Sequence, residues 1–261
     1  MKKILGIVQA RMESKRFPGK VLKVVKNKSL LELLLNRLII SKKINQIIVV
    51  TTKQESDNVI AKLVNNLGLN LYRGSTTNVL ESFYNAALNY QAEIIVRITG
   101  DCPIIDPNIV DNIIEYYLSN NYDYVSNTIN PTYPDGLDVE VFSFKTLRTA
   151  YNSTNLKHNT EHVTPYIKNS NKFLLGSFEN SNDYSENRWT VDYEVDFKLI
   201  EKIVSYFYPR INFSMKEILE YKILNPEIFE INKHIKRNEG SSINEKEKEK
   251  EKRVNESLLK K

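Results

Sequence analysis

Four cationic side chains lie close together in the first twenty residues. Arg11, Lys15, Arg16 and Lys20 fall within ten positions, and the Pro-Gly pair at 18–19 predicts a turn before the last of them. Cations at this spacing repel one another, which favours a site for a polyanion such as a chain of phosphates. The spacing matches neither a P-loop nor a dinucleotide-binding fingerprint. A solvated loop, with each charge facing water, is the alternative.

Acidic side chains follow two predicted strands. Asp101 follows the predicted strand 93–99 after a single glycine, and Asp192 comes directly after the predicted strand 188–191. A carboxylate at the end of a buried parallel strand can hold Mg²⁺, while waters and phosphates complete the octahedron. The alternative for Asp101 is a helix N-cap, but Asp106, directly before a proline, is better placed for that role. The pattern admits a metal site formed by Asp101 and Asp192.

Further polar residues are candidates for a second substrate. Asp138 and Glu140 alternate on a predicted strand and so point to the same face, where they could line a pocket and accept hydrogen bonds from hydroxyls. A solvent-facing edge strand fits the same pattern. Glu161 and His162 precede an apolar helix, where a lone histidine more often has a structural role. Cys102 adjoins Asp101, whose charge should raise the pKa of the thiol and disfavour a thiolate nucleophile.

The elements that must position these residues follow an alternating pattern. We predict strands at 3–9, 44–52, 70–72, 93–99, 122–126, 139–144, 173–178 and 188–191, and helices at 30–40, 57–67, 79–90, 109–118, 144–151 and 195–207. Such alternation is typical of βαβ crossovers and a mostly parallel sheet. We therefore predict one α/β domain over residues 1–231, with ligands bound beyond the carboxyl ends of its strands.

Composition limits the remaining classes of protein. The chain has 261 residues, and residues 233–261 carry ten Lys or Arg against six Glu. Residues 1–232 carry 27 against 26, so the nearly neutral body argues against a general nucleic-acid surface. No apolar run approaches the roughly 18 residues that span a bilayer. The single cysteine fits a reducing compartment, so we expect a cytoplasmic protein without a membrane span.

The C-terminal residues 232–261 form a charged tail in this interpretation. From 245 to 252 the sequence alternates strictly between Glu and Lys, which on a helix places like charges at i,i+4 and opposite charges at i,i+3. The two contributions roughly cancel, and few apolar residues lie nearby to dock the segment. We expect a disordered or frayed helical tail, with a partner-binding segment as the alternative.

Six segments, in order, resemble the nucleotide-sugar cytidylyltransferases, especially the spore-coat-polysaccharide branch that is related to the acylneuraminate and 3-deoxy-manno-octulosonate enzymes. Segment 7–22 reads Ile-Val-Gln-Ala-Arg-Met-x-Ser-x-Arg-x-Pro-Gly-Lys-Val-Leu, and segment 97–106 reads Arg-Ile-Thr-Gly-Asp-Cys-Pro-Ile-Ile-Asp. The others lie at 72–80, 135–142, 161–167 and 189–197. The first motif and the Gly-Asp-x-Pro motif are fairly specific, and the resemblance covers roughly residues 3–225.

The resemblance implies a Rossmann-like nucleotidyltransferase fold of the glycosyltransferase-A type, with a mixed, mostly parallel sheet flanked by helices. It implies a nucleotide site with Mg²⁺ as cofactor and CTP and a sugar as substrates. The nucleotide would contact Ala10, Arg11, Ser14, Arg16, Lys20, Arg73 and Ser75, the metal would bind Asp101 and Asp192, and the acceptor would face Asp138, Glu140, Glu161 and His162. Members of such families often dimerise, so a homodimer is a further implication.

The reaction that this implies is in-line attack of a sugar hydroxyl on the α-phosphorus of CTP, with release of pyrophosphate. Arg11, Lys20 and Asp101 would be the catalytic residues, because positioning and charge neutralisation dominate such chemistry. A glycosyltransferase of the same fold is one alternative, although the cationic loop suits a free triphosphate better. A non-catalytic nucleotide-binding scaffold is another, which Glu13, at a position that is usually Gly, and the charged tail would favour.

Overall fold

The computed structural model describes residues 2–154, 156–237 and 239, in which the strands form one seven-stranded sheet and a short hairpin. The sheet order is β5-β4-β1-β6-β8-β7-β9. Its strands are β1 (Ile4–Gln9), β4 (Gln46–Thr52), β5 (Asn70–Gly74), β6 (Ile94–Thr99), β7 (Tyr124–Ser126), β8 (Glu140–Ser143) and β9 (Leu175–Ser177). Strand β8 runs antiparallel to both of its neighbours, and the other pairings are parallel. The predicted mixed, mostly parallel sheet is confirmed.

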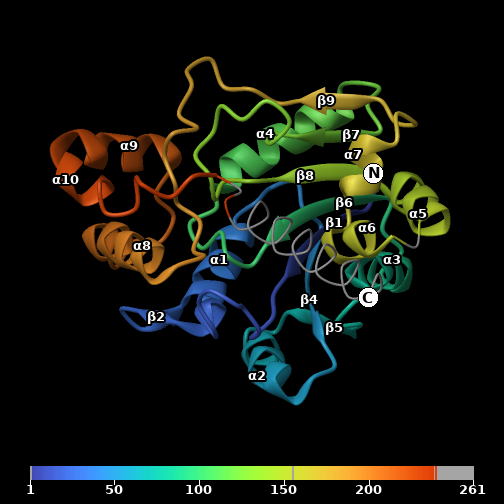
Figure 1. Ribbon diagram of the computed structural model, residues 1–261, viewed down its shortest axis with the longest axis horizontal. Helices are drawn as coiled ribbons and strands as arrows, with labels where there is room; N and C mark the ends of the chain where they lie inside the picture. The colour runs from blue at the N-terminus through green and yellow to red at the C-terminus, as the bar shows by residue number, and fades with distance from the viewer. Residues whose placement is uncertain (1, 155, 238, 240–261) are drawn as a thin grey trace, which may run out of the picture.

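Helices cover both faces of this sheet. They are α1 (Leu30–Leu38), α2 (Asn58–Asn66), α3 (Val79–Asn89), α4 (Pro107–Leu118), α5 (Phe144–Ser153), α6 (Lys157–His162), α7 (Pro165–Asn169), α8 (Glu194–Phe207), α9 (Met215–Leu224) and α10 (Pro226–Phe229). Figure 1 shows α3, α5, α6 and α7 grouped on one side of the sheet, and α8, α9 and α10 well away on the other. None of the helices in the described ranges is long and apolar enough to cross a bilayer.

Alternating side chains on the central strands form two separate cores. Ile4 and Val8 of β1 pack in one core with α1, α2, α4 and α8, whereas Leu5 and Ile7 pack in the other with α3, α5 and α7. This two-sided burial explains the nearly continuous apolar sequence of the strands, because a parallel sheet covered on both faces has no solvent-facing side. The helices packed on the two faces hold the carboxyl ends of β1, β4, β5 and β6 at one edge of the sheet.

Two parts of the predicted pattern need correction. The strand predicted at 188–191 is wrong: Arg188 forms a single bridge to Asp135, and the residues after it are irregular. Trp189 N–H donates to the carbonyl of Asp135 and Val191 N–H to that of Asp101, so the segment pairs with two different loops and forms no continuous ladder. Strand β8 begins at Glu140, so Asp138 lies before it. The short hairpin of β2 (Val24–Val25) and β3 (Lys28–Ser29) and helices α6, α9 and α10 were not predicted, whereas α7 is the helix expected after His162.

A buried arginine ties α1 to the segments around the site. Arg37 is 1% exposed, and its guanidinium donates hydrogen bonds to the carbonyls of Ile104, Ile105, Ile211 and Phe213. Burial lowers the pKa of Arg37 to about 10, although Asp106 and Glu217 raise it. Because four carbonyls are satisfied by one side chain, Arg37 fixes the chain that leaves β6 against the segment that follows α8.

Packed structure continues past residue 231. Asn232 is 2% exposed, and its side-chain amide donates to the carbonyl of Arg188 (3.0 Å) and to Oδ1 of Asp196 (2.9 Å). Arg237 donates to the carbonyl of Tyr133 and pairs with Asp138. The start of the predicted tail therefore belongs to the folded body. The Glu/Lys alternation at 245–252 lies outside the described residues.

Candidate active site

The site lies where the strand order reverses. From β1 the chain adds β4 and β5 on one side, then crosses back to place β6 on the other side of β1. The loops after β1 and β6 diverge at such a point and leave a crevice for a ligand. Gly100 lets them approach, because its N–H donates to the carbonyl of Gln9 at 2.8 Å and a Cβ there would lie 2.8 Å from the same oxygen.

Lys20 and the two carboxylates of the predicted metal site meet in this crevice. The Lys20 ammonium nitrogen Nζ lies 2.9 Å from Oδ2 of Asp101 and 2.9 Å from Oδ1 of Asp192. Arg16 reaches the same Asp192 oxygen at 2.8 Å. The backbone explains the convergence, since Val191 N–H donates to the carbonyl of Asp101 at 2.9 Å and so brings Asp192 beside it.

The pKa shifts of this group follow from the pairing. Burial alone would raise the pKa of Asp101, but the Lys20 charge and hydrogen bonds from Thr99 and Lys20 lower it to about 2. Burial would lower the pKa of Lys20, yet the two carboxylates raise it overall. Asp101 and Lys20 are therefore both charged at neutral pH. Two anionic oxygens converge on one cationic nitrogen, an arrangement of charge that also suits a small divalent cation.

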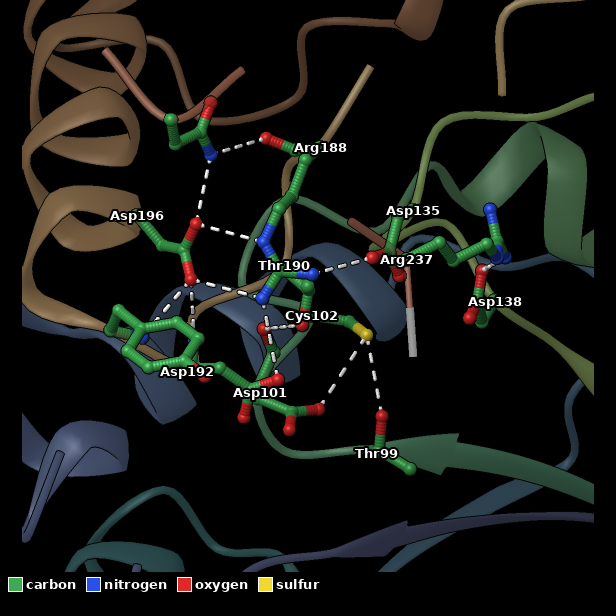
Figure 2. Close-up of polar contacts among 12 residues, drawn as sticks. Thr99, Asp101, Cys102, Asp135, Asp138, Arg188, Thr190, Asp192, Asp196 and Arg237 are labelled. Atoms are coloured by element: carbon green, nitrogen blue, oxygen red, sulfur yellow. Dashed lines mark hydrogen bonds and ion pairs between the residues drawn. The ribbon is translucent and has the colours of Figure 1, made fainter. Parts of the chain in front are cut away.

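A second arginine, Arg188, also contacts Asp192, as Figure 2 shows. Arg188 contacts Asp135 at 2.7 Å, Asp192 at 3.3 Å and Asp196 at 2.9 Å. Asp196 is fully buried and also accepts hydrogen bonds from the backbone N–H groups of Asp192 and Tyr193. Tyr193 is the N-cap residue of α8. Burial would lower the pKa of Arg188, but the hydrogen bonds and charges of these carboxylates raise it. Arg188 therefore stays ionised and holds the segment that carries Asp192.

The segment 135–138 packs against the same arginine. Gly136 has φ +108°, and a Cβ there would lie 2.4 Å from the backbone nitrogen of Thr190, so glycine is required. The close approach lets Trp189 N–H donate to the carbonyl of Asp135 at 2.6 Å. Two segments that lie far apart in the sequence thereby form one wall of the crevice.

A pocket opens on the other side of the crevice, beyond β1, β4 and β5. It is lined by Gln9, Ala10, Arg11, Val50, Thr51, Thr52, Ser75, Thr76, Val79 and Ser82. Three predicted nucleotide contacts, Ala10, Arg11 and Ser75, are thus brought together. Buried Asp57 shapes the pocket, because it accepts hydrogen bonds from Met12 N–H and from the hydroxyls of Thr51 and Thr52.

Arg73 and Ser14, also predicted to contact the nucleotide, have structural hydrogen bonds. Arg73 donates to the carbonyls of Thr52 and Gln54, and so holds the turn after β4. Ser14 Oγ accepts the N–H of Phe17 at 3.4 Å. Neither is among the residues that line the pocket.

Asp138 and Glu140, two of the four residues predicted to face the acceptor, have different side-chain partners. Glu140 is buried and accepts hydrogen bonds from Tyr124, Thr164 and Arg97. Burial would raise its pKa, but Arg97, Lys168 and these hydroxyls lower it to about 2. Asp138 instead pairs with Arg237 at 2.5 Å, and burial raises its pKa to about 7 despite the Arg237 charge. Two acids two residues apart therefore have opposite shifts.

Glu161 and His162 lie at the end of α6, and Thr164, two residues after His162, donates a hydrogen bond to Glu140. The His162 ring is 5.0 Å from that of His158, one helical turn earlier. Within the described ranges, no group of three or more His, Cys, Asp or Glu side chains could hold a metal ion by itself. The sequence interpretation of Cys102 is confirmed: it is buried, and burial together with Asp101 raises the pKa of its thiol well above the usual value.

Sequence reasoning missed the residues that organise the carboxylates. Arg188 was assigned to a strand, Arg237 to a tail, and Arg97 to the buried interior of β6. A local signal exists for Arg188, which lies four residues before Asp192 and eight before Asp196. Arg237 and Asp138 are 99 residues apart, so no local pattern connects them.

Comparisons with known proteins agree with this arrangement. The sequence model of the cytidylyltransferase family matches residues 5–251. An uncharacterized protein of Methanocaldococcus jannaschii is 42% identical over 93% of this chain and all of its own length. The spore coat polysaccharide biosynthesis protein SpsF of Bacillus subtilis is 28% identical over 87% of this chain and 97% of its own. A solved cytidylyltransferase structure from Leptospira borgpetersenii has 31% identity and a TM-score of 0.84, covering 88% of this chain and 97% of that one.

The sheet order, the cationic loop after β1 and the strand-end carboxylates define a nucleotidyltransferase with a Rossmann-like fold. The family match covers most of the sequence. The chain belongs to the cytidylyltransferase family and is an enzyme of that class.

Proposed function

We propose that the enzyme transfers CMP from CTP to a hydroxyl of a sugar acid or related sugar, releases pyrophosphate, and serves the synthesis of a surface polysaccharide. The family match supports CTP as donor. The Bacillus subtilis relative is a spore coat polysaccharide biosynthesis protein, which supports the polysaccharide role. The single, buried Cys102 fits a reducing compartment, and we assign the enzyme to the cytoplasm.

The observation that carries the proposal is the convergence of Lys20, Asp101 and Asp192 beside the pocket that Arg11 lines. In this assignment the nucleoside part occupies the pocket beyond β1 and β4, and the phosphates extend toward the crevice. Arg11, Arg16 and Lys20 bind the phosphates and offset the charge that grows on the departing pyrophosphate. Because the reaction asks little covalent work of the protein, these residues act by position and charge.

The donor set fits Mg²⁺. This ion is commonly bound by one or two carboxylates, and waters and phosphates supply the other ligands. We assign the protein ligands to Asp101 and Asp192. When bound, Mg²⁺ supplies Lewis-acid polarisation of a phosphoryl oxygen. Arg188 keeps the Asp192 carboxylate in position, and the hydrogen bond from Val191 N–H to the Asp101 carbonyl keeps the two side chains adjacent.

A binding panel followed by a transfer assay tests the proposal. Thermal unfolding is measured with CTP, UTP, GTP, ATP and dTTP, each with and without Mg²⁺, since ligands of the native state raise the melting temperature. We expect a CTP-selective, Mg²⁺-dependent increase. Pyrophosphate release is then measured with CTP and a panel of sugar acids, and CMP-sugar is identified by mass.

Three other outcomes would count against the proposal. A rise with nucleotide-sugars alone would favour a glycosyltransferase. CTP binding without pyrophosphate release for any sugar would favour a scaffold. No rise with any nucleotide would contradict the proposed site.

A further inference from the structure

Lys20 lies where a metal ion shared by Asp101 and Asp192 would also have to lie. Its Nζ is 2.9 Å from an oxygen of each carboxylate, and its side chain is 11% exposed. The two acids that we assign to Mg²⁺ thus share the Lys20 ammonium as a common cation. A divalent cation and the Lys20 ammonium repel each other, so both cannot occupy this position.

Arg16 provides a second observation, which points to an anionic ligand beside Asp192. Its Nη2 pairs with Asp192 at 2.8 Å, while its Nε is buried and has no hydrogen-bond partner among the described residues. A buried donor without a partner is costly, and Nε of a guanidinium is suited to an anionic oxygen. Arg16 therefore has a donor available for a phosphate while it holds Asp192.

The loop geometry lets Lys20 change partners without moving the backbone. Lys20 N–H donates to Phe17 at 3.2 Å, Gly19 N–H donates to Met12 at 3.0 Å, and a 3₁₀ turn begins at Lys20. These bonds fix the main chain. The four-carbon stem of lysine has several rotatable bonds, so its ammonium, a compact point charge, can be redirected while the main chain stays in place.

We propose that Lys20 couples metal binding to nucleotide binding. In the free enzyme its ammonium holds Asp101 and Asp192 together in place of the metal ion, and it turns to the phosphates when Mg²⁺ and CTP bind together. This inference rests on the proposed function and adds how its two ligands depend on each other. Mg²⁺ alone must compete with Lys20 and faces Arg16 and Arg188 beside Asp192, whereas CTP alone finds Lys20 engaged. Each ligand therefore strengthens binding of the other by the same factor.

Calorimetric titration of the protein with Mg²⁺, in the absence of nucleotide, tests whether Lys20 competes with the metal ion. Lys20→Met removes the competing charge and keeps the length of the side chain, so it should bind Mg²⁺ at least about tenfold more tightly than wild type. Lys20→Arg keeps the charge and should stay as weak as wild type. Lys15→Met is the matched control, because it removes the same charge from an exposed position of the same loop. In Lys20→Met/Asp101→Asn the gain should disappear.

Trp189 gives a second readout that needs no turnover. It is the single tryptophan and lies three residues before Asp192, so its fluorescence can follow CTP binding. In wild type, Mg²⁺ should tighten CTP binding by at least about tenfold, and in Lys20→Met this factor should fall below about threefold. Circular dichroism establishes that each variant is folded.

The outcomes distinguish a failure of the coupling role of Lys20 from a failure of the proposed function. If Lys20→Met binds Mg²⁺ no more tightly than wild type and Lys15→Met, the coupling role is wrong, even when wild type binds Mg²⁺ and CTP and transfers CMP. If Lys20→Met gains affinity but the double variant keeps the gain, the metal binds elsewhere and the coupling role is again wrong. If wild type fails to bind CTP with Mg²⁺, the proposed function fails, whatever the metal titrations show.

Discussion

The loops after β1, β4 and β5 and the segments around Arg188 meet in one crevice, yet they use charge differently. In the first region, Arg11 lines the pocket and forms no ion pair with any residue that the structure describes. In the second, Arg188 contacts three carboxylates and is itself buried. Charges that have few partners are available to a ligand, whereas charges paired in a buried network fix positions. Lys20 and Arg16 join the two regions, because they come from the first and contact Asp192 in the second.

Asp101→Asn should produce the largest change in activity. We expect CMP transfer to fall at least about a hundredfold, because the variant loses an anionic ligand where charge is neutralised. Lys20 still pairs with Asp192, so the melting temperature should shift by less than about 5 °C. The assay is pyrophosphate release with a sugar that wild type accepts. Glu194→Gln, an exposed change two residues from Asp192, is the control, and equal activity in both variants would reject Asp101 as a ligand.

Arg188→Met should produce the largest change in stability. Removing the cation leaves Asp135 and Asp196 buried without their partner, which should cost about 3–5 kcal/mol in the free energy of unfolding. Denaturant unfolding measures it. Lys198→Met breaks an exposed pair with Glu194 and should cost less than about 0.5 kcal/mol. A similar small cost for Arg188→Met would mean that the second region is not a fixed network.

Glu140 predicts a loss of stability in acid. Its folded-state pKa of about 2 lies below the usual 4.5, so its contribution is complete above pH 4.5 and is lost as the pH falls toward 2. The contribution is about 3 kcal/mol at neutral pH. The difference in unfolding free energy between wild type and Glu140→Gln should therefore shrink below pH 4.5. A difference that stays constant from pH 6 to pH 3 would contradict the pairing with Arg97.

Asp138 predicts a smaller effect of opposite sign. Its folded-state pKa of about 7 lies above the usual 3.8, so its contribution is complete below pH 3.8 and is lost as the pH rises through 7. Because 30% of the side chain is exposed, we expect only about 1 kcal/mol. Wild type should lose stability relative to Asp138→Asn between pH 5 and pH 8. Arg237→Gln should extend the loss to higher pH, since Arg237 lowers this pKa; an unchanged pH range of the loss would show that the pair is not formed.

Local patterns predicted most of the fold. The strands predicted at 3–9, 44–52 and 93–99 appear as β1, β4 and β6 with shifts of at most two residues at either end. Asp106 caps α4 as its place before Pro107 suggested, and its carboxylate accepts Asn108 N–H. Apolar periodicity and capping act over a few residues, so a single sequence contains them. The residues 188–191 were wrongly predicted as a strand because an apolar run does not show whether a neighbouring strand is available.

The cationic loop, the strand-end position of Asp101 and the order of strands and helices can all be read from the amino-acid sequence. Each depends on residues close together in the chain, or on the rule that parallel strands present their carboxyl ends at one edge. Which charges meet is known from the three-dimensional fold alone. It placed Lys20 between Asp101 and Asp192, enclosed Glu140 with Arg97, and brought Arg237 to Asp138. The physical reason is that burial and ion pairing depend on distances in space, and partners 43 to 172 residues apart leave no periodic trace in the sequence.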